Sequence, residues 1–257
     1  TDGSLVYNQQ HAVMPNGDSL NGDATSTQSA IIVKEPASSS RYYIFTVDDN
    51  GGLNGLSYSI VDMSLNAGFG DVINKNTPLD APTPEKVLAI KHQNCSDFWI
   101  VTQNLTSDYH TYILTSSGIT NSTSPIISTG TGVATIAGYL KANTDGSRIA
   151  NALYNGDFSG DFCFNVWDFD NTTGMLSNPM TFSWGSASQD NKTYGIEFSP
   201  SGDLLYVSAP YKEKIYQYNL LAGSQVDIDN TKYTIINSSS NNGGALQLGP
   251  DNKIYFA

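Results

Sequence analysis

Apolar and polar residues alternate along most of this chain, and short turns of Gly, Pro, Asp and Asn interrupt the alternation. Residues 196–220 show the pattern in full: IEFSPSGDLLYVSAPYKEKIYQYNL. An alternating run ends in the turn Pro200-Ser201-Gly202-Asp203, a second run returns, and a third follows another polar turn. A period of two with this punctuation predicts strands joined by tight turns. The segment therefore predicts three consecutive antiparallel strands.

The same pattern recurs along the chain. Residues 138–155 (GYLKANTDGSRIANALYN) and 244–257 (GALQLGPDNKIYFA) contain the apolar run, the turn and the returning strand. Aligned on the end of the returning strand, the repeats fall at intervals of 45, 56, 50, 56 and 49 residues, at Thr1, Thr46, Thr102, Ala152, Ser208 and Ala257. Repeats of roughly 40–50 residues with four short strands are typical of β-propeller blades.

The predicted fold is an all-β propeller of four-stranded blades, forming a single domain or a fragment of one. Blades are expected at residues 28–84, 85–130, 135–187 and 193–237, with partial blades at 1–27 and 243–257. We expect a portion of a six- or seven-bladed propeller. A closed five-bladed ring is the alternative, because the partial blades would supply the outer and the inner two strands of one blade. No segment has a helical period.

Composition narrows the function classes. Only 14% of the residues are charged, and 12 basic against 24 acidic residues give a net charge of −12. Nucleic acid is excluded as a partner, because that affinity rests on neutralised phosphates. No stretch approaches the ~20 apolar residues of a membrane span. The acidity fits solubility outside the cell.

Two cysteines and two acidic turns are candidate sites of special chemistry. We expect Cys95 and Cys163 to be free thiols, because the turns that carry them should fall on opposite faces of the propeller. Residues 48–52 (DDNGG) and 167–174 (WDFDNTTG) contain oxygen ligands that could hold Ca²⁺. The interpretation as solvated turns is preferred, since Asp and Asn side chains bond local amides there.

Catalytic motifs are absent from the sequence. His11, His92 and His110 share no metal-ligand spacing, and there is no G-x-S-x-G, no H-E-x-x-H and no phosphate-binding glycine loop. His92 follows a strand and is expected to bond a turn. We therefore predict no catalytic residues, no metal and no cofactor.

One repeated position carries candidate binding residues. Ten to twelve residues before the repeat anchors, the innermost strand of five blades carries a long polar side chain after an apolar residue: Lys34, Lys91, Lys141, Glu197 and Gln247. Around a propeller axis these side chains would form a ring, which could seat an anion or a carbohydrate. The preferred interpretation is nevertheless structural, with ion pairs such as Lys141 with Glu197 between blades.

The chain also resembles a known family, the propeller region of large cell-surface proteins exported by the type IX secretion system of gliding bacteria. The segments that match the family are TDGSLVYNQQHAVMPNG, STQSAIIV, YYIFTVD, LSYSIVDM, GDVINKNTPL and EKVLAIKHQNCSDFWIVT, followed by WDFDNTTGMLSNP and LQLGPDNKIYFA. Gln103 departs from the family, where His is common. The resemblance implies an extracellular or outer-surface location and partners that are proteins or carbohydrates at the cell surface, with secretion-system components among them.

The leading functional prediction is therefore a non-enzymatic recognition, adhesion or scaffold module. One alternative is a hydrolase, because FSPSGDLLYVS is similar to blades of lactonase-type propellers. Those enzymes carry a central cation held by Glu, Asn and Asp, whereas only Glu197 is available here among three lysines. A glycan-binding lectin module is the other alternative.

Overall fold

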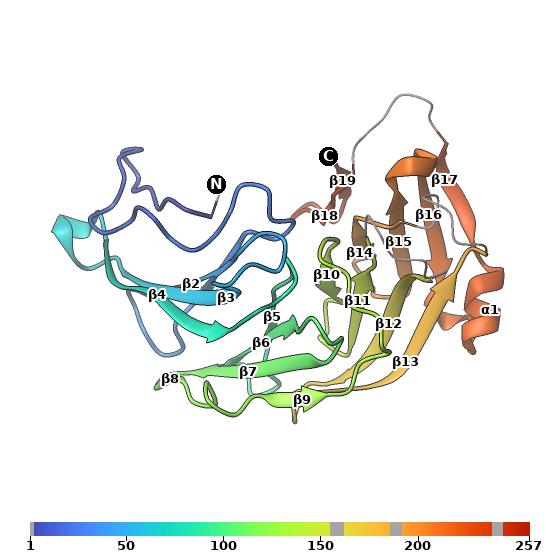
Figure 1. The fold of residues 1–257 in the computed structure, drawn as a ribbon, viewed down its shortest axis with the longest axis horizontal. Coiled ribbons are helices and arrows are strands. Elements are labelled where there is room, and N and C mark those ends of the chain that lie inside the picture. Colours follow the sequence, from blue (N-terminus) through green and yellow to red (C-terminus); the bar gives the residue numbers. More distant parts are fainter. Residues whose placement is uncertain (1–2, 155–161, 186–191, 238–243) are drawn as a thin grey trace. The chain divides into compact units, whose positions relative to one another are not determined.

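The protein is described by a computed structural model, which places residues 3–154, 162–185, 192–237 and 244–257. Consecutive strands form separate antiparallel sheets, three of them with four strands in chain order (Figure 1). The four-stranded blade that the repeats predicted is confirmed. Two compact units can be distinguished: unit 1 holds Thr1–Ile136 and Thr172–Met175, and unit 2 holds Ala137–Asn171 and Leu176–Ala257. The number of blades in the whole propeller stays a prediction.

Unit 1 contains two sheets. The strands of the first are β1 (Ala30–Lys34), β2 (Arg41–Val47), β3 (Leu56–Asp62) and β4 (Asp71–Asp80), with the short 3-10 helix η1 (Asn66–Gly68) before β4. The second consists of β5 (Leu88–Lys91), β6 (Phe98–Gln103), β7 (Tyr109–Thr115) and β8 (Gly118–Ile119), and β9 (Ile126–Ser128) also pairs with β7. Three register shifts occur between β3 and β4.

Unit 2 contains two full sheets and one pair of strands. Its first sheet runs β10 (Leu140–Ala142), β11 (Arg148–Ala152), β12 (Phe162–Asp170) and β13 (Met175–Ser183). The second runs β14 (Ile196–Phe198), β15 (Leu204–Ala209), β16 (Lys214–Asn219) and β17 (Tyr233–Asn237). The helices η3 (Pro210–Lys212), η4 (Leu220–Ala222) and α1 (Gln225–Asn230) lie between its strands, and β18 (Leu246–Leu248) pairs with β19 (Ile254–Phe256).

The turn between the first and second strands is the most regular part of the repeat. In four sheets the first turn residue accepts a hydrogen bond from the fourth, whose φ is positive: His92–Cys95, Asn143–Gly146, Ser199–Gly202 and Gly249–Asn252. Gly and Asn adopt positive φ readily, and this explains why they mark the repeats. His92 Nδ1 accepts from Asn94 N at 2.9 Å, which confirms that this imidazole bonds a turn.

Each unit has its own apolar core. In unit 1 the core includes Phe45 and Leu56 from one sheet and Ile100 and Leu114 from the other, all without exposed surface. In unit 2 the Phe164 and Phe182 rings stack with centroids 4.5 Å apart. Burying one such side chain contributes about 1.5–3 kcal/mol. These cores fix the sheets that carry the candidate residues.

Two local predictions need correction. Residues 4–20 were expected to form two outer strands, but they contain only an isolated bridge between Tyr7 and Val13. Their apolar side chains pack instead on the first sheet, with Met14 and Leu20 in a cluster that includes Val61. The helix α1 was not expected either. It begins at a capping box in which Ser224 and Asp227 bond reciprocally.

The predictions for the two cysteines and the two acidic turns agree with the structure. Neither Cys95 nor Cys163 forms a disulfide bond, as predicted. Residues 171–174 form the expected turn between β12 and β13. In the other acidic turn, the Asp48 carboxylate accepts hydrogen bonds from the backbone amides of Asp49 and Asn54. Residues 238–243, which join the blade predicted at 193–237 to the last partial blade, lie outside the described residues.

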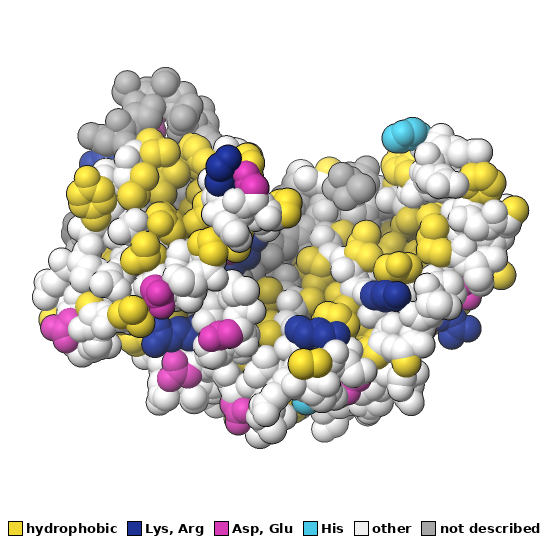
Figure 2. Space-filling view, turned by 180° about the vertical axis from the view of Figure 1, so that it is seen from behind, with side chains coloured by type: hydrophobic (Ala, Val, Ile, Leu, Met, Phe, Trp, Pro, Cys, Tyr) yellow, Lys and Arg dark blue, Asp and Glu magenta, His cyan; other side chains and the backbone are white. Residues whose placement is uncertain are grey.

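The surface agrees with the low charge content. One face shows mainly neutral polar and hydrophobic side chains, with charged ones scattered among them (Figure 2). Within the described chain, no helix has the length and apolar character needed to cross a membrane.

Candidate functional site

The five polar residues predicted from the repeat all lie on the first strand of a sheet. Lys34 and Lys91 end β1 and β5, whereas Lys141, Glu197 and Gln247 are the middle residues of β10, β14 and β18. Each follows a buried apolar residue, so each side chain points to the other face of its strand: Val33, Ile90, Leu140, Ile196 and Leu246. Their arrangement as one ring stays a prediction, and the two units are taken in turn.

In unit 2, three of these residues meet. The strand β14 lies between β10 and β18. Lys141 Nζ is 3.1 Å from Glu197 Oε2 and donates to Gln247 Oε1 at 2.7 Å. The expected ion pair between Lys141 and Glu197 is therefore present, and we call these three residues the Glu197 cluster.

Backbone amides fix the carboxylate of this cluster. Glu197 Oε1 accepts from Phe198 N at 3.1 Å, and Oε2 accepts from Leu248 N at 3.0 Å. The side chains of Glu197 and Lys141 are only 6% and 13% exposed, whereas Gln247 lies at the surface. A carboxylate oxygen can accept two hydrogen bonds, so Oε1 retains acceptor capacity for a further proton donor. The cluster thus places a proton acceptor beside a fixed cation.

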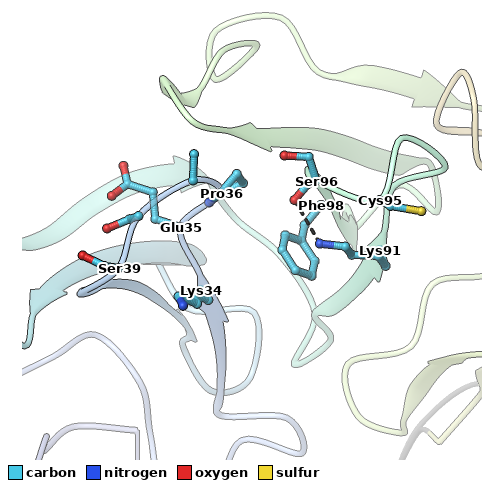
Figure 3. Close-up of a pocket in the computed structure, with 10 residues that line it drawn as sticks. Lys34, Glu35, Pro36, Ser39, Lys91, Cys95, Ser96 and Phe98 are labelled. Atoms are coloured by element: carbon cyan, nitrogen blue, oxygen red, sulfur yellow. Dashed lines mark hydrogen bonds between the residues drawn. The ribbon is translucent and has the colours of Figure 1, made fainter.

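In unit 1, the other two residues line one pocket. Lys34 and Lys91 contribute to its wall together with Glu35 and Phe98 (Figure 3), and its volume is about 490 Å³. Lys91 Nζ donates to Ser96 O at 3.0 Å and lies 4.1 Å from the centre of the Phe98 ring. This pocket could not be predicted from the sequence, because its walls come from two turns about 60 residues apart.

A buried pair between the His110 imidazole and the Asp80 carboxylate was not predicted from the sequence. His110 Nδ1 lies 2.6 Å from Asp80 Oδ2, and the Tyr112 hydroxyl donates to the same oxygen at 3.0 Å. The hydrogen bond to Asp80, opposed by burial, raises the pKa of His110. Both partners of the pair are mostly buried, so its first role is to hold β7 against the end of β4.

The candidate residues do not suit a divalent cation. An ammonium group 3.1 Å from Glu197 Oε2 occupies the position where a cation would compete for the same oxygen. Among the residues that the structure places, no three His, Cys, Asp or Glu side chains are arranged to bind a metal ion. A divalent cation therefore does not fit the Glu197 cluster.

No protein-family model and no curated protein matches this chain. Solved structures match this chain at low sequence identity. The periplasmic gluconolactonase PpgL of Pseudomonas aeruginosa matches with a TM-score of 0.58 and 16% identity over 84% of this chain and 61% of its own. A putative 6-phosphogluconolactonase from Bacteroides fragilis matches with a TM-score of 0.54 and 14% identity, over 86% and 62% of the two chains. Another from Bacteroides uniformis has a TM-score of 0.52 and 16% identity, over 95% and 65%.

These matches correct one prediction and confirm another. The protein was predicted not to be an enzyme, and that prediction is wrong: gluconolactonase-type propellers recur among its structural neighbours. Its premise was the lack of linear catalytic motifs, but a propeller assembles side chains from separate blades and needs none. The chain spans less than two thirds of the length of these three structures. Its fold is the all-β propeller that the repeats predicted.

Proposed function

We propose that this protein is a lactonase-like propeller hydrolase that opens a lactone ring at the Glu197 cluster without a divalent cation. The observation that carries the proposal is the position of Glu197, a carboxylate fixed by two backbone amides and held 3.1 Å from the Lys141 ammonium. The structural neighbours named as lactonases support the choice of reaction.

The reaction needs a base and a cation, and the cluster offers both. Glu197 Oε1 takes a proton from a water molecule as the water oxygen bonds to the carbonyl carbon of the lactone. The Lys141 ammonium stabilises the negative charge that develops on the carbonyl oxygen. The ring C–O bond then breaks, and the proton on Glu197 passes to the departing alkoxide, which becomes the hydroxyl of the open-chain acid.

Gln247 positions the cation in this scheme. Its Oε1 accepts a hydrogen bond from Lys141 Nζ, and its Nε2 donates to Leu248 O at 3.0 Å. The ammonium is therefore held between two oxygens from neighbouring strands. Because the pair is mostly buried, its charges are screened less than surface charges would be.

The experiment compares ring opening of glucono-δ-lactone, followed in a pH-stat, for the wild type and for Glu197→Gln. We expect the wild type to exceed the buffer rate and Glu197→Gln to lose about 100-fold or more of that excess. Lys141→Met should lose activity to a similar degree. The matched control is Glu213→Gln, which removes a carboxylate from the turn before β16 and should keep the rate.

Two outcomes would overturn the proposal. One is a wild-type rate equal to buffer for a panel of five- and six-membered lactones. The other is a folded Glu197→Gln variant, verified by circular dichroism, that retains the full rate.

We also propose an extracellular or outer-surface location. The family resemblance and the net charge of −12 support it. Protease digestion of intact source cells tests this proposal: the protein should be degraded while a cytoplasmic marker survives, and protection equal to that of the marker would refute it.

A further inference from the structure

We propose that the pocket between β1 and β5 binds a small phosphate-bearing anion, either inorganic phosphate or a phosphate monoester. We call it the two-lysine pocket, after Lys34 and Lys91. This inference goes beyond the proposed hydrolysis, because the pocket lies in unit 1 and shares no residue with the Glu197 cluster.

The first argument is the origin of the two lysines. The strands β1 and β5 are neighbours, and both lysines are the last residues of their strands. Figure 3 shows them on opposite sides of the pocket, with the turn after β1 on one side and the turn after β5 on the other. Two like charges facing one cavity repel each other, and a bound anion relieves that repulsion.

The second argument is the state of each ammonium group. Lys91 Nζ is fixed by Ser96 O and by the Phe98 ring, so it presents its charge at a defined point. Lys34 is exposed, and among the described residues its ammonium has no hydrogen-bond or ion-pair partner. One cation is therefore positioned in advance, and the other is available to close on a ligand.

Serine hydroxyls add uncharged donors to the wall. Ser38 Oγ accepts from Arg41 N at 3.0 Å and from Ser40 N at 3.3 Å, so its own hydrogen can point elsewhere. Ser39 and Ser96 also line the pocket. Phosphate oxygens accept several hydrogen bonds at once, and a wall of hydroxyl and ammonium donors matches that need.

The single acidic residue in the wall reduces the positive charge of the two lysines but does not reverse it. Glu35 lines the pocket, but its Oε2 lies 3.9 Å from the Arg41 guanidinium. The positive charge of the pocket stands out in a protein with a net charge of −12. Two ammonium groups favour a dianion over a monoanion such as a carboxylate. The volume of about 490 Å³ also admits an attached group of sugar size.

The test is calorimetric titration of the whole chain with four probes: inorganic phosphate, glucose 6-phosphate, glucose and acetate. We expect both phosphate probes to bind, and glucose and acetate to bind at least tenfold more weakly. Equal affinities for the two phosphate probes would identify free phosphate as sufficient, and tighter binding of glucose 6-phosphate would identify a monoester as the ligand.

Variants then assign the site. Lys34→Gln and Lys91→Gln should each weaken phosphate binding about tenfold or more, whereas Lys75→Gln, which removes an exposed lysine paired with Asp18, should not. Thermal melting verifies that all three variants are folded. Phosphate affinity that survives in both pocket variants would overturn the proposal, and so would glucose or acetate binding as tight as phosphate.

Discussion

The buried ammonium group of Lys86 should make the free energy of unfolding depend on pH. Its side chain has no exposed surface, and its Nζ donates to Thr135 Oγ1 at 3.0 Å. Burial lowers the pKa of Lys86 from 10.5 to about 7, and the nearby charge of Glu85 opposes that shift. The folded protein therefore binds fewer protons than the unfolded chain between pH 7 and 10.5.

The sign and size of the pH dependence follow from this difference. Below about pH 7 the lysine is protonated in both states, and the folded state bears the full cost of a buried charge. Above it the folded state releases the proton, so the free energy of unfolding rises by about 1.4 kcal/mol per pH unit until the unfolded chain also titrates. Because the lysine in the folded state is already half deprotonated at pH 7, the gain between pH 7 and pH 9 is about 2 kcal/mol.

The perturbation is Lys86→Met, which keeps an unbranched side chain but removes the ammonium. Urea denaturation at pH 6, 7, 8 and 9 gives the free energy of unfolding for both proteins. We expect the wild type to gain about 2 kcal/mol relative to Lys86→Met between pH 7 and pH 9. Lys34→Met, at an exposed lysine, controls for the loss of one positive charge. A difference between wild type and Lys86→Met that stays constant with pH would refute the reasoning.

Three further predictions use single sites. Cys95 is exposed and Cys163 buried, so a thiol reagent should label one thiol in the native protein and two after unfolding; two rapid native reactions would contradict this. The raised pKa of His110 means that its pairing with Asp80 stabilises the fold fully below about pH 6.5 and fades as pH rises through that raised pKa. In urea denaturation, Asp80→Asn should therefore cost more at pH 5.5 than at pH 8.5, and an equal cost would refute it. At Gly202, with φ +77, Ala should cost about 1 kcal/mol in the same assay, since a Cβ would lie 3.2 Å from Asn143 Nδ2; an unchanged midpoint would count against the turn geometry.

Much of the fold could be predicted because the repeat couples a period of two to turns with special backbone needs. Gly202 and Asn252 occupy equivalent positive-φ positions, and such positions restrict the residue type strongly. Backbone hydrogen bonds such as Val6 N to Gly17 O and Leu20 N to Ser4 O join the two arms of residues 4–20, but they form only one isolated bridge, so the segment packs as an irregular loop on the first sheet. The helix α1 had a signal in Ser224 and Asp227, but six residues are too few for a helical period to show.

The candidate site could be predicted only in part. The repeat phase identified Lys141, Glu197 and Gln247 although they are 56 and 50 residues apart, because equivalent strand positions come together in neighbouring sheets. Lys86, Asp80 and His110 do not recur at an equivalent position of the repeat. Their properties arise from burial and from contacts across 30 or more residues, which no local pattern records. For the same reason, the absence of a linear motif gave the wrong answer on catalysis.

We propose that Glu197, beside the fixed Lys141 ammonium, promotes lactone hydrolysis without a divalent cation. The most direct test is the initial rate of lactone opening for wild-type protein dialysed exhaustively against chelator, measured beside Glu197→Gln in the same buffer. We expect the dialysed wild type to keep its rate and the rate of Glu197→Gln to fall by about 100-fold or more. A rate that chelator abolishes and added divalent cation restores, with Glu197→Gln still active under the restored conditions, would contradict it.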